Sequence, residues 1–532
     1  MFVLAFLVGI YSYLILSIGL LGILYRETIY VSSLIFILFF VYIYKSYFID
    51  GVRHAKHFAV EVTKDKKILF LICLLSAHAL VNLIGVLGPE ISFDALWYHL
   101  TLPKIYLQNN EVFFIPGSLF YYSAMPKLTE MLYIPAVLLS GEILAKLIHF
   151  SFGVITCISV YKITREFLNK RYAVLASLLF YGNLVVGWES IASYVDLSRT
   201  FFESLSFLAF LYWIKTKKEY FFITSAFMLG LAVSSKVIAL GSLVIYFVLI
   251  GMNVEKVAER IKRVFIFSFL AIFPSLPWIA FAYVHTGNPV YPFFTDLYQT
   301  RLNINIFPYD VFKTIRDTFL YGQDPISPIY LIIIPIVLVV FPRLKKLAKM
   351  PFVYSGLALL IWYLTPQTGG GRFILPYLPV LSVATLITVS AVRDRLIKKL
   401  LVSLMIFVFV VSIGYRFLAN QKFIGFLTGA QSKSEFLRKN LNFSYGDFYD
   451  IDGFFKKTIK DSDTVLLYGF HNLYYADFKF VHSSYSREGD KFNYIATQGV
   501  QIPERFKYWQ LIYSNPVTNV RIYTLGGREW IY

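Results

Sequence analysis

Residues 67–88 read KILFLICLLSAHALVNLIGVLG, and residues 89–100 continue as PEISFDALWYHL. The first part offers about 20 mostly apolar residues in a row, enough for an α-helix to cross the hydrocarbon core of a bilayer. The second part places the carboxyl group of Asp94, the imidazole of His99 and aromatic rings directly beyond that segment. The stretch predicts a membrane span that ends in a polar, aromatic surface, where chemistry on a lipid-borne substrate would be placed.

The composition extends this prediction to the whole chain. Of its 532 residues, 57% are hydrophobic and only 15% are charged, and the mean hydropathy is +0.62. Apolar runs recur along most of the sequence, and they predict an all-α polytopic membrane protein with about 13 spans. The net charge of +18 does not indicate nucleic-acid binding, because the basic residues form short clusters between apolar runs.

The basic clusters fall at alternate connections, which the positive-inside rule assigns to the cytoplasm. They occupy residues 45–67, 162–171, 215–218, 256–263, 343–349 and 393–399. This alternation predicts a cytoplasmic N-terminus in a plasma (inner) membrane and a long outer loop at residues 89–142. It holds only if the apolar stretch 128–139 does not span, so we expect an interfacial or re-entrant helix there. The first apolar segment lacks a basic start and a cleavage site, so we expect it to be retained.

A change in composition divides the chain into two predicted domains. Residues 1–417 form the transmembrane domain, and residues 418–532 form a small soluble α/β domain on the extracytoplasmic side. Residues 464–468 and 520–524 are typical of β-strands. Cys73 and Cys157 each lie in an apolar run, so neither a disulfide framework nor a cysteine-based zinc site is expected.

The first candidate site is the outer loop that contains Asp94. If this loop is helical, Asp94 shares a face with Trp97 and Tyr98, while His99 projects elsewhere. A partly desolvated carboxylate beside aromatic rings suits a general base that acts on a sugar hydroxyl. The alternative is that Asp94 caps the helix and that the rings anchor it at the interface. Glu130, farther along the loop, completes this set of polar side chains.

The second candidate is Asp196, at a short outer connection that enters the next span. It is either a helix cap or a second active-site acid that holds a metal ion or the acceptor. Glu203 lies two turns deeper, where an unpaired carboxylate in the bilayer would be costly. A neighbouring basic group is the alternative explanation for Glu203.

Lys236 and Arg372 form the third candidate, because both fall at outer ends of spans where positive charge is disfavoured. Each therefore calls for an anionic partner, such as a phosphate. Glycines 369–371 before Arg372 would let a phosphate approach backbone N–H groups while the guanidinium binds it. Snorkelling of both side chains to lipid headgroups is the alternative.

The remaining candidates line the same side of the membrane. Tyr291 lies in the turn-rich outer loop 286–293, and His149 lies at the outer end of a span, one turn from Lys146. A zinc site from His99, His149 and a carboxylate is not favoured, because the paired histidine spacing is missing.

In combination these residues resemble the motifs of the GT-C membrane glycosyltransferases. The nearest group is family 39, with the protein O-mannosyltransferases and the aminoarabinose-lipid A transferases. The resemblance covers about residues 85–420, and it rests on the order and common side of several short motifs. These are the acidic loop with Asp94, Val195-Asp196-Leu197, Gly230-Leu231-Ala232 followed by Lys236, Gly287-Asn288-Pro289 with Tyr291-Pro292, and Arg372-Phe373 with Pro376 and Pro379.

The resemblance implies transfer of a hexose or pentose from a polyprenyl-phosphate donor to a glycan, lipid or protein acceptor in the cell envelope, with inversion. Asp94 would be the base and Asp196 a second acid. Arg372, with Lys127 or Lys236, would neutralise the departing lipid phosphate. The chain has Ala95 where many members have a second acid, which leaves metal dependence open: the resemblance implies no specific cofactor, and a divalent metal at Asp94 and Asp196 is the alternative.

A competing function is a transporter or lipid flippase in which Asp94, Asp196 and Glu203 relay protons or substrate. The crowding of polar groups at the outer ends of spans, away from the bilayer midplane, disfavours it. A structural or adhesion protein that displays the C-terminal domain is a third alternative, and it would not need the charged outer residues.

Overall fold

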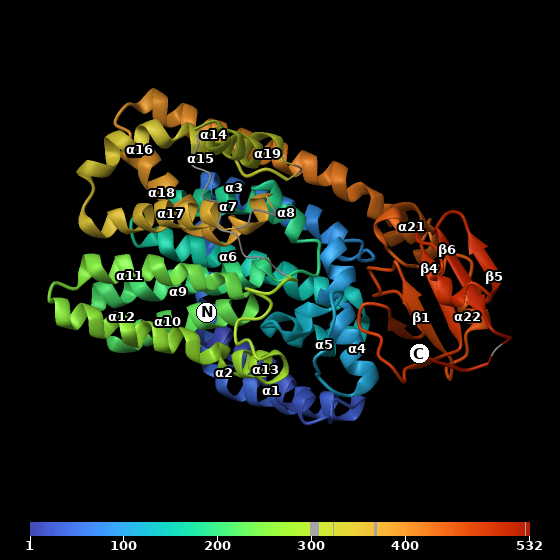
Figure 1. Cartoon of the computed structure of the whole chain (residues 1–532). Coiled ribbons are helices and arrows are strands. Elements are labelled where there is room, and N and C mark those ends of the chain that lie inside the picture. The colour runs from blue at the N-terminus through green and yellow to red at the C-terminus, as the bar shows by residue number, and fades with distance from the viewer. Residues whose placement is uncertain (298–307, 323, 366–369, 527) are drawn as a thin grey trace.

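The computed structural model describes residues 1–297, 308–322, 324–365, 370–526 and 528–532. Gly369 of the glycine-rich turn and part of the outer loop 286–326 lie outside these residues. Figure 1 shows an elongated bundle of helices with the red C-terminal segment forming a sheet-containing unit at one end. The expected division into a helical region and a small C-terminal sheet region is therefore visible in the fold.

Helices make up most of the chain up to residue 458. They are α1 (Phe2–Leu20), α2 (Arg26–Lys64), α3 (Lys66–Val86), α4 (Thr101–Asn109), α5 (Leu128–Ser140), α6 (Glu142–Arg165), α7 (Lys170–Tyr181), α8 (Leu184–Glu189), α9 (Asp196–Thr216), α10 (Glu219–Ser235), α11 (Ser242–Asn253), α12 (Val257–Ile272), α13 (Leu276–Thr286), α14 (Pro308–Arg316), α15 (Ile329–Ile332), α16 (Ile334–Val340), α17 (Lys346–Leu364), α18 (Leu378–Ala391), α19 (Arg395–Asn420), α20 (Ile424–Leu427), α21 (Lys433–Asn440) and α22 (Phe454–Thr458).

Long apolar helices confirm that the protein is a multi-pass membrane protein. Within the described residues, 7 segments are long and apolar enough to cross a membrane, and shorter apolar helices of 10–17 residues accompany them. The expected number of about 13 spans is not confirmed. Several expected spans are short because the chain breaks at a polar or proline-containing turn, as at Lys236 between α10 and α11 and at Pro376 before α18.

The apolar stretch 128–139, which was expected to be an interfacial or re-entrant helix, forms α5. Its residues from Leu128 to Ala136 are buried, and it packs against α1, α4 and α6. Its 13 residues rise only about 20 Å, too little to cross a hydrocarbon core of about 30 Å. The helix is therefore part of the core of the bundle and does not span the membrane.

The C-terminal region contains a five-stranded sheet in the order β2-β1-β4-β6-β5. The second strand in this order, β1 (Thr464–Tyr468), pairs in parallel with β2 (Lys479–His482) and with β4 (Tyr494–Gln498). The strand β6 (Val520–Thr524) pairs antiparallel with β4 and with β5 (Gln510–Asn515), and β3 (Lys491–Phe492) pairs with β7 (Trp530–Ile531). Both predicted strands are present.

Residues 474–476 carry several hydrogen bonds between this sheet region and the helical bundle. Lys104 donates from Nζ to the carbonyls of Tyr474 and Ala476, at 2.8 and 2.9 Å. The hydroxyl of Tyr475 donates to the carbonyl of Glu90 at 2.8 Å, and the backbone N–H of Tyr474 donates to Leu96. The loop after β1 is thereby held against the segment that contains Asp94.

Candidate active site

The structure brings together four residues that the sequence analysis selected singly. Arg372 donates from Nη1 to Oδ2 of Asp94 at 2.5 Å and from Nε to Oδ2 of Asp196 at 2.8 Å. Lys236 donates from Nζ to Oδ1 of Asp196 at 2.7 Å. We refer to these residues and Glu189, which lies against Arg372, as the charge cluster.

Asp94 is the solvent-accessible acid of the charge cluster. It is the N-cap residue of a short π-helix (Ala95–His99), but its side chain makes no capping hydrogen bond and is directed to Arg372 instead. The Tyr98 hydroxyl donates to Asp94 at 3.4 Å. Burial would raise the pKa of Asp94, but the charge of Arg372 outweighs it and holds the pKa below its ordinary value.

Asp196 is buried completely and lies in the first turn of α9. Val195 is the N-cap residue of that helix, so Asp196 does not serve as the cap. Both of its carboxylate oxygens accept from cations. Burial would raise the pKa of Asp196, but Arg372 and Lys236 together hold it far below its ordinary value. Asp196 is therefore the fixed anion that positions the two cations.

Glu189, the last residue of α8, joins the cluster although its local sequence predicts no role for it. Its side chain is buried completely, and its Oε1 lies 3.2 Å from Nε of Arg372. Neither carboxylate oxygen has a hydrogen-bond partner among the described residues. Burial, and then the negative charge of Asp196, raise the pKa of Glu189 well above its ordinary value. This shift favours the protonated form of Glu189, in which two carboxylates, those of Asp94 and Asp196, face the two cations of the cluster.

Arg372 is held in place by the backbone as well as by the acids. It lies in a 3-10 helix (Gly370–Phe373), and Gly370 has a φ of +53°, a left-handed conformation that favours glycine. The guanidinium lies 4.1 Å from the ring centre of Tyr194, and the Lys236 ammonium lies 4.9 Å from that of Phe373. These cation–π contacts further stabilise the two charges.

An aromatic wall borders Asp94 and includes one residue from the C-terminal region. The rings of Tyr98 and Tyr122 stack with centres 3.7 Å apart. The ring of His471 lies 4.2 Å from that of Trp97 and stacks on Phe93 at 4.9 Å. No sequence pattern near His471 signalled this position, because the loop after β1 reaches the wall only through the docking of the whole sheet region.

Two predicted pocket residues, His99 and Glu130, form a pair of their own. His99 Nδ1 lies 2.8 Å from Oε1 of Glu130, and both side chains are buried. The ring of Tyr194 lies 5.5 Å from that of His99. The contact that the structure gives His99 is with Glu130, so the pair is described separately from the charge cluster.

His149 has a structural role in this arrangement. Its Nδ1 lies within hydrogen-bond distance of the carbonyls of Glu189 and Ala192, and its Nε2 accepts from the backbone N–H of Leu197. This pattern describes a neutral imidazole that joins the two ends of the loop 189–197. Lys146, one turn away, donates to the carbonyls of Gly85 and Gly88.

Three other predicted residues lie outside the cluster. Lys127 donates from Nζ to the carbonyls of residues 122, 123 and 125 and lies over the ring of Trp278. Tyr291 lines a narrow cavity of about 30 Å³ with Trp278. Glu203 accepts from Arg199 at 2.7 Å, which is the neighbouring basic group that the sequence analysis offered as the alternative.

The arrangement of the acids bears on the open question of a metal ion. Across the described ranges, no group of three or more His, Cys, Asp and Glu side chains is placed to hold one. Arg372 lies between Asp94 and Asp196, so its guanidinium takes the position that a shared cation would need. As arranged, the donor set fits a protein-supplied cation better than a divalent metal.

The family described as dolichyl-phosphate-mannose-protein mannosyltransferase matches residues 135–278. The matched range contains Glu189, Asp196 and Lys236, while Asp94 and Arg372 lie outside it. No curated protein matches the chain by sequence.

Solved structures with a similar fold include ArnT from Cupriavidus metallidurans bound to undecaprenyl phosphate. The TM-score is 0.60 at 11% identity, and the match covers 85% of this chain and 97% of ArnT. The apo state of ArnT gives a TM-score of 0.59 at 10% identity, with the same coverage of both chains. The expected resemblance to GT-C membrane glycosyltransferases of this type is confirmed.

Proposed function

We propose, from the GT-C membrane glycosyltransferase fold of this chain, that it moves a sugar from a polyprenyl-phosphate donor to an acceptor hydroxyl. The observation that carries the proposal is the charge cluster, in which Arg372 lies between an accessible carboxylate, Asp94, and a buried one, Asp196. Such a transfer needs one base near the acceptor and fixed positive charge near the phosphate. ArnT, which has a similar fold, was solved with undecaprenyl phosphate, and this supports a lipid phosphate as the leaving group here.

In the proposed reaction, Asp94 is the general base. The side chain of Asp94 is 21% exposed, whereas that of Asp196 is fully buried, so Asp94 is the carboxylate that an acceptor can reach. The acceptor hydroxyl gives its proton to Asp94, and its oxygen forms the new bond to the anomeric carbon. The bond from that carbon to the phosphate oxygen breaks, and attack from the opposite face inverts the configuration.

Arg372 and Lys236 bind the phosphate in this proposal. The leaving polyprenyl phosphate gains one negative charge, and the two cations stabilise that charge in a site with little water. Asp196 keeps both cations in place. Lys127 was expected to share this role, but its ammonium donates to three backbone carbonyls, so we assign the phosphate to Arg372 and Lys236.

Binding of the donor also prepares the base. Without donor, Arg372 is paired with Asp94 and holds the carboxyl at a low pKa, which makes Asp94 a weak base. A donor phosphate competes with Asp94 for the guanidinium. When Arg372 donates to the phosphate in place of Asp94, the carboxylate of Asp94 no longer has a cation beside it. The pKa of Asp94 then rises, so Asp94 becomes a stronger base once the donor sugar is bound.

The aromatic wall provides the acceptor side of the site. Trp97, Tyr98 and Tyr122 present ring faces next to Asp94, and such faces pack well on the C–H surfaces of sugars and on other apolar acceptor groups. We propose that the C-terminal region covers this side through His471. We further propose that the site lies on the extracytoplasmic side of a plasma membrane, with the N-terminus in the cytoplasm.

The experiment that tests this proposal supplies the purified chain with polyprenyl-phosphate sugars and measures released polyprenyl phosphate. The wild-type chain is expected to release it in the presence of acceptor, and Asp94→Asn is expected to lose at least 100-fold in rate. Asp461→Asn, an exposed acid of the C-terminal region, is the matched control. Full turnover by Asp94→Asn would remove Asp94 as the base.

A further inference from the structure

A second feature lies at the opposite end of the bundle from the charge cluster. Helix α3 has 21 residues, so it extends about 30 Å, the thickness of a hydrocarbon core. It begins at Lys66 and ends at Val86, and Asp94 follows shortly after that end. The start of α3 therefore lies across the membrane from Asp94.

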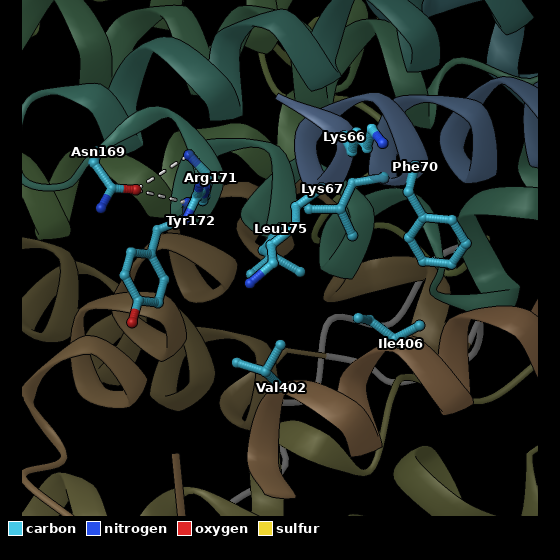
Figure 2. Close-up of a pocket in the computed structure, with 10 residues that line it drawn as sticks. Lys66, Lys67, Phe70, Asn169, Arg171, Tyr172, Leu175, Val402 and Ile406 are labelled. Carbon is cyan, nitrogen blue, oxygen red and sulfur yellow. Dashed lines mark hydrogen bonds between the residues drawn. The ribbon is translucent and has the colours of Figure 1, made fainter. Parts of the chain in front are cut away.

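A cavity of about 540 Å³ opens at this end, where α3, α7 and α19 meet. Figure 2 shows Asn169, Arg171 and Tyr172 on one side of the opening, Lys67 and Phe70 on the other, and Val402 and Ile406 below. Lys66, Leu71 and Leu175 complete the lining.

The rim of the cavity is positively charged. Its lining includes Lys66, Lys67 and Arg171 and no acidic residue. Nearby Asp65 accepts from Nε of Arg171 at 2.8 Å and also caps α3. This single acid holds Arg171 at the rim, but it balances only one of the three cations. The excess positive charge favours an anion at the rim.

The rest of the cavity is apolar and lies deeper in the membrane. Phe70 is about one helical turn beyond Lys66, or about 6 Å along α3. Val402 and Ile406 lie about 10 to 16 Å along α19 from its first residue, Arg395. A free phosphate would use the charged rim and leave this wall empty. In a phospholipid, the acyl chain begins a few ångströms below the anionic headgroup. The apolar wall lies below the charged rim in the same way, so one phospholipid can occupy both.

We propose that this cavity binds one anionic phospholipid from the leaflet opposite the charge cluster. The phosphate lies at the basic rim, and one acyl chain lies along Phe70, Val402 and Ile406. The binding is selective for anionic over neutral headgroups because three cations converge on the phosphate. The site is independent of sugar transfer, and its occupant is neither the donor nor the acceptor of the proposed reaction.

Native mass spectrometry of the full chain in a neutral detergent tests the proposal directly. The chain is titrated with phosphatidylglycerol or with phosphatidylcholine of the same acyl chains, and the first bound lipid is measured. Wild type is expected to bind phosphatidylglycerol at least tenfold more tightly. The triple variant Lys66→Gln, Lys67→Gln, Arg171→Gln is expected to lose this preference, since each cation near a headgroup is worth about fivefold in affinity.

The matched control removes the same charge elsewhere on that side of the bundle. It changes the exposed residues Lys217, Lys218 and Lys256 to Gln, and it is expected to keep the preference. Val402→Trp fills the apolar wall without changing charge, and it is expected to weaken phosphatidylglycerol binding about fivefold. If the triple variant does not fold, the two single variants Arg171→Gln and Val402→Trp are compared with wild type instead. Both are expected to bind phosphatidylglycerol more weakly.

Three results would overturn the proposal. The first is equal binding of the two lipids by wild type. The second is an equal loss in the control variant, which would indicate attraction by net charge alone. The third is full competition by glycerol phosphate, which has the headgroup chemistry without acyl chains and would identify a free phosphate as the occupant.

Discussion

Arg372 and Asp94 form an ion pair of 2.5 Å, although 278 residues separate them in the sequence. Arg372 also contacts Asp196 at 2.8 Å, so one guanidinium connects the accessible acid to the buried one. This arrangement ties the proposed base and the proposed phosphate site to a single side chain. A change in Arg372 should therefore affect both roles at once.

Arg372→Lys keeps the charge but loses the planar group that donates to two acids. A lysine ammonium is a point charge and cannot reproduce both contacts. We expect kcat/KM for the lipid-linked donor to fall about 100-fold, comparable to the loss of one preorganised donor at a developing charge. Release of polyprenyl phosphate measures this. Arg505→Lys, in the C-terminal region, is the control and should retain full activity.

The ion pair also predicts a difference between two pH profiles. In the free enzyme, Arg372 holds the pKa of Asp94 below its ordinary value, so the acid limb of kcat/KM should lie below the ordinary pKa of an aspartate, about 4. In the donor complex the phosphate competes for Arg372, so the pKa of Asp94 rises. The acid limb of kcat should therefore lie at least one pH unit higher than that of kcat/KM, and superimposable limbs would contradict the proposed exchange.

Glu189 gives a prediction on stability. Its pKa in the folded chain is raised well above its ordinary value, so the protonated form is favoured by folding. The stability that this contributes is present at pH values below the unfolded pKa and is lost as the pH rises toward the folded pKa. Glu189→Gln mimics the protonated form without titrating. We expect its Tm to equal that of wild type near pH 5 and to exceed it increasingly toward pH 9.

Asp196→Asn is the contrasting variant for this experiment. Arg372 and Lys236 hold the pKa of Asp196 far below its ordinary value, so the charged form is the one that stabilises the fold. Removing that charge leaves Lys236 without its carboxylate and Arg372 with only Asp94 as a charged partner, which costs about 3–5 kcal/mol. A lower Tm at all pH values from 5 to 9 is expected. Equal behaviour of the two variants would contradict the assigned protonation states.

The sequence predicted the parts of this site whose position depends on membrane topology. Asp94, Asp196, Lys236 and Arg372 each follow or end an apolar run, so the alternation of basic clusters was enough to assign them to one side. Glu189 has the same kind of position, but nothing in its local pattern distinguishes a buried acid from a solvated one at a helix end. Glu189 is buried against Arg372, and only the packing of the folded chain places these two residues next to each other.

Two further features depend on contacts between distant segments. The sequence of α5 is compatible with an interfacial or a re-entrant helix, and its neighbours α1, α4 and α6 are what bury it. Lys127 is chemically suited to a phosphate, but the turn before α5 places three carbonyls around its ammonium. In both cases the local sequence defines what a residue can do, and contacts between distant segments decide which of those interactions it makes.

His471 is the residue whose role local sequence could least predict, and it yields the last prediction. Its ring stacks between the aromatic wall and the C-terminal region, 4.2 Å from Trp97. If this ring covers the acceptor, His471→Ala should raise KM for the acceptor about fivefold with little change in kcat, since such ring contacts contribute about 1 kcal/mol. His471→Phe keeps the stacking and should stay close to wild type. Tyr508→Ala, an exposed ring elsewhere in the region, controls for loss of an aromatic group. If His471→Ala instead lowers kcat and leaves KM unchanged, the ring acts on the reaction and does not cover the acceptor.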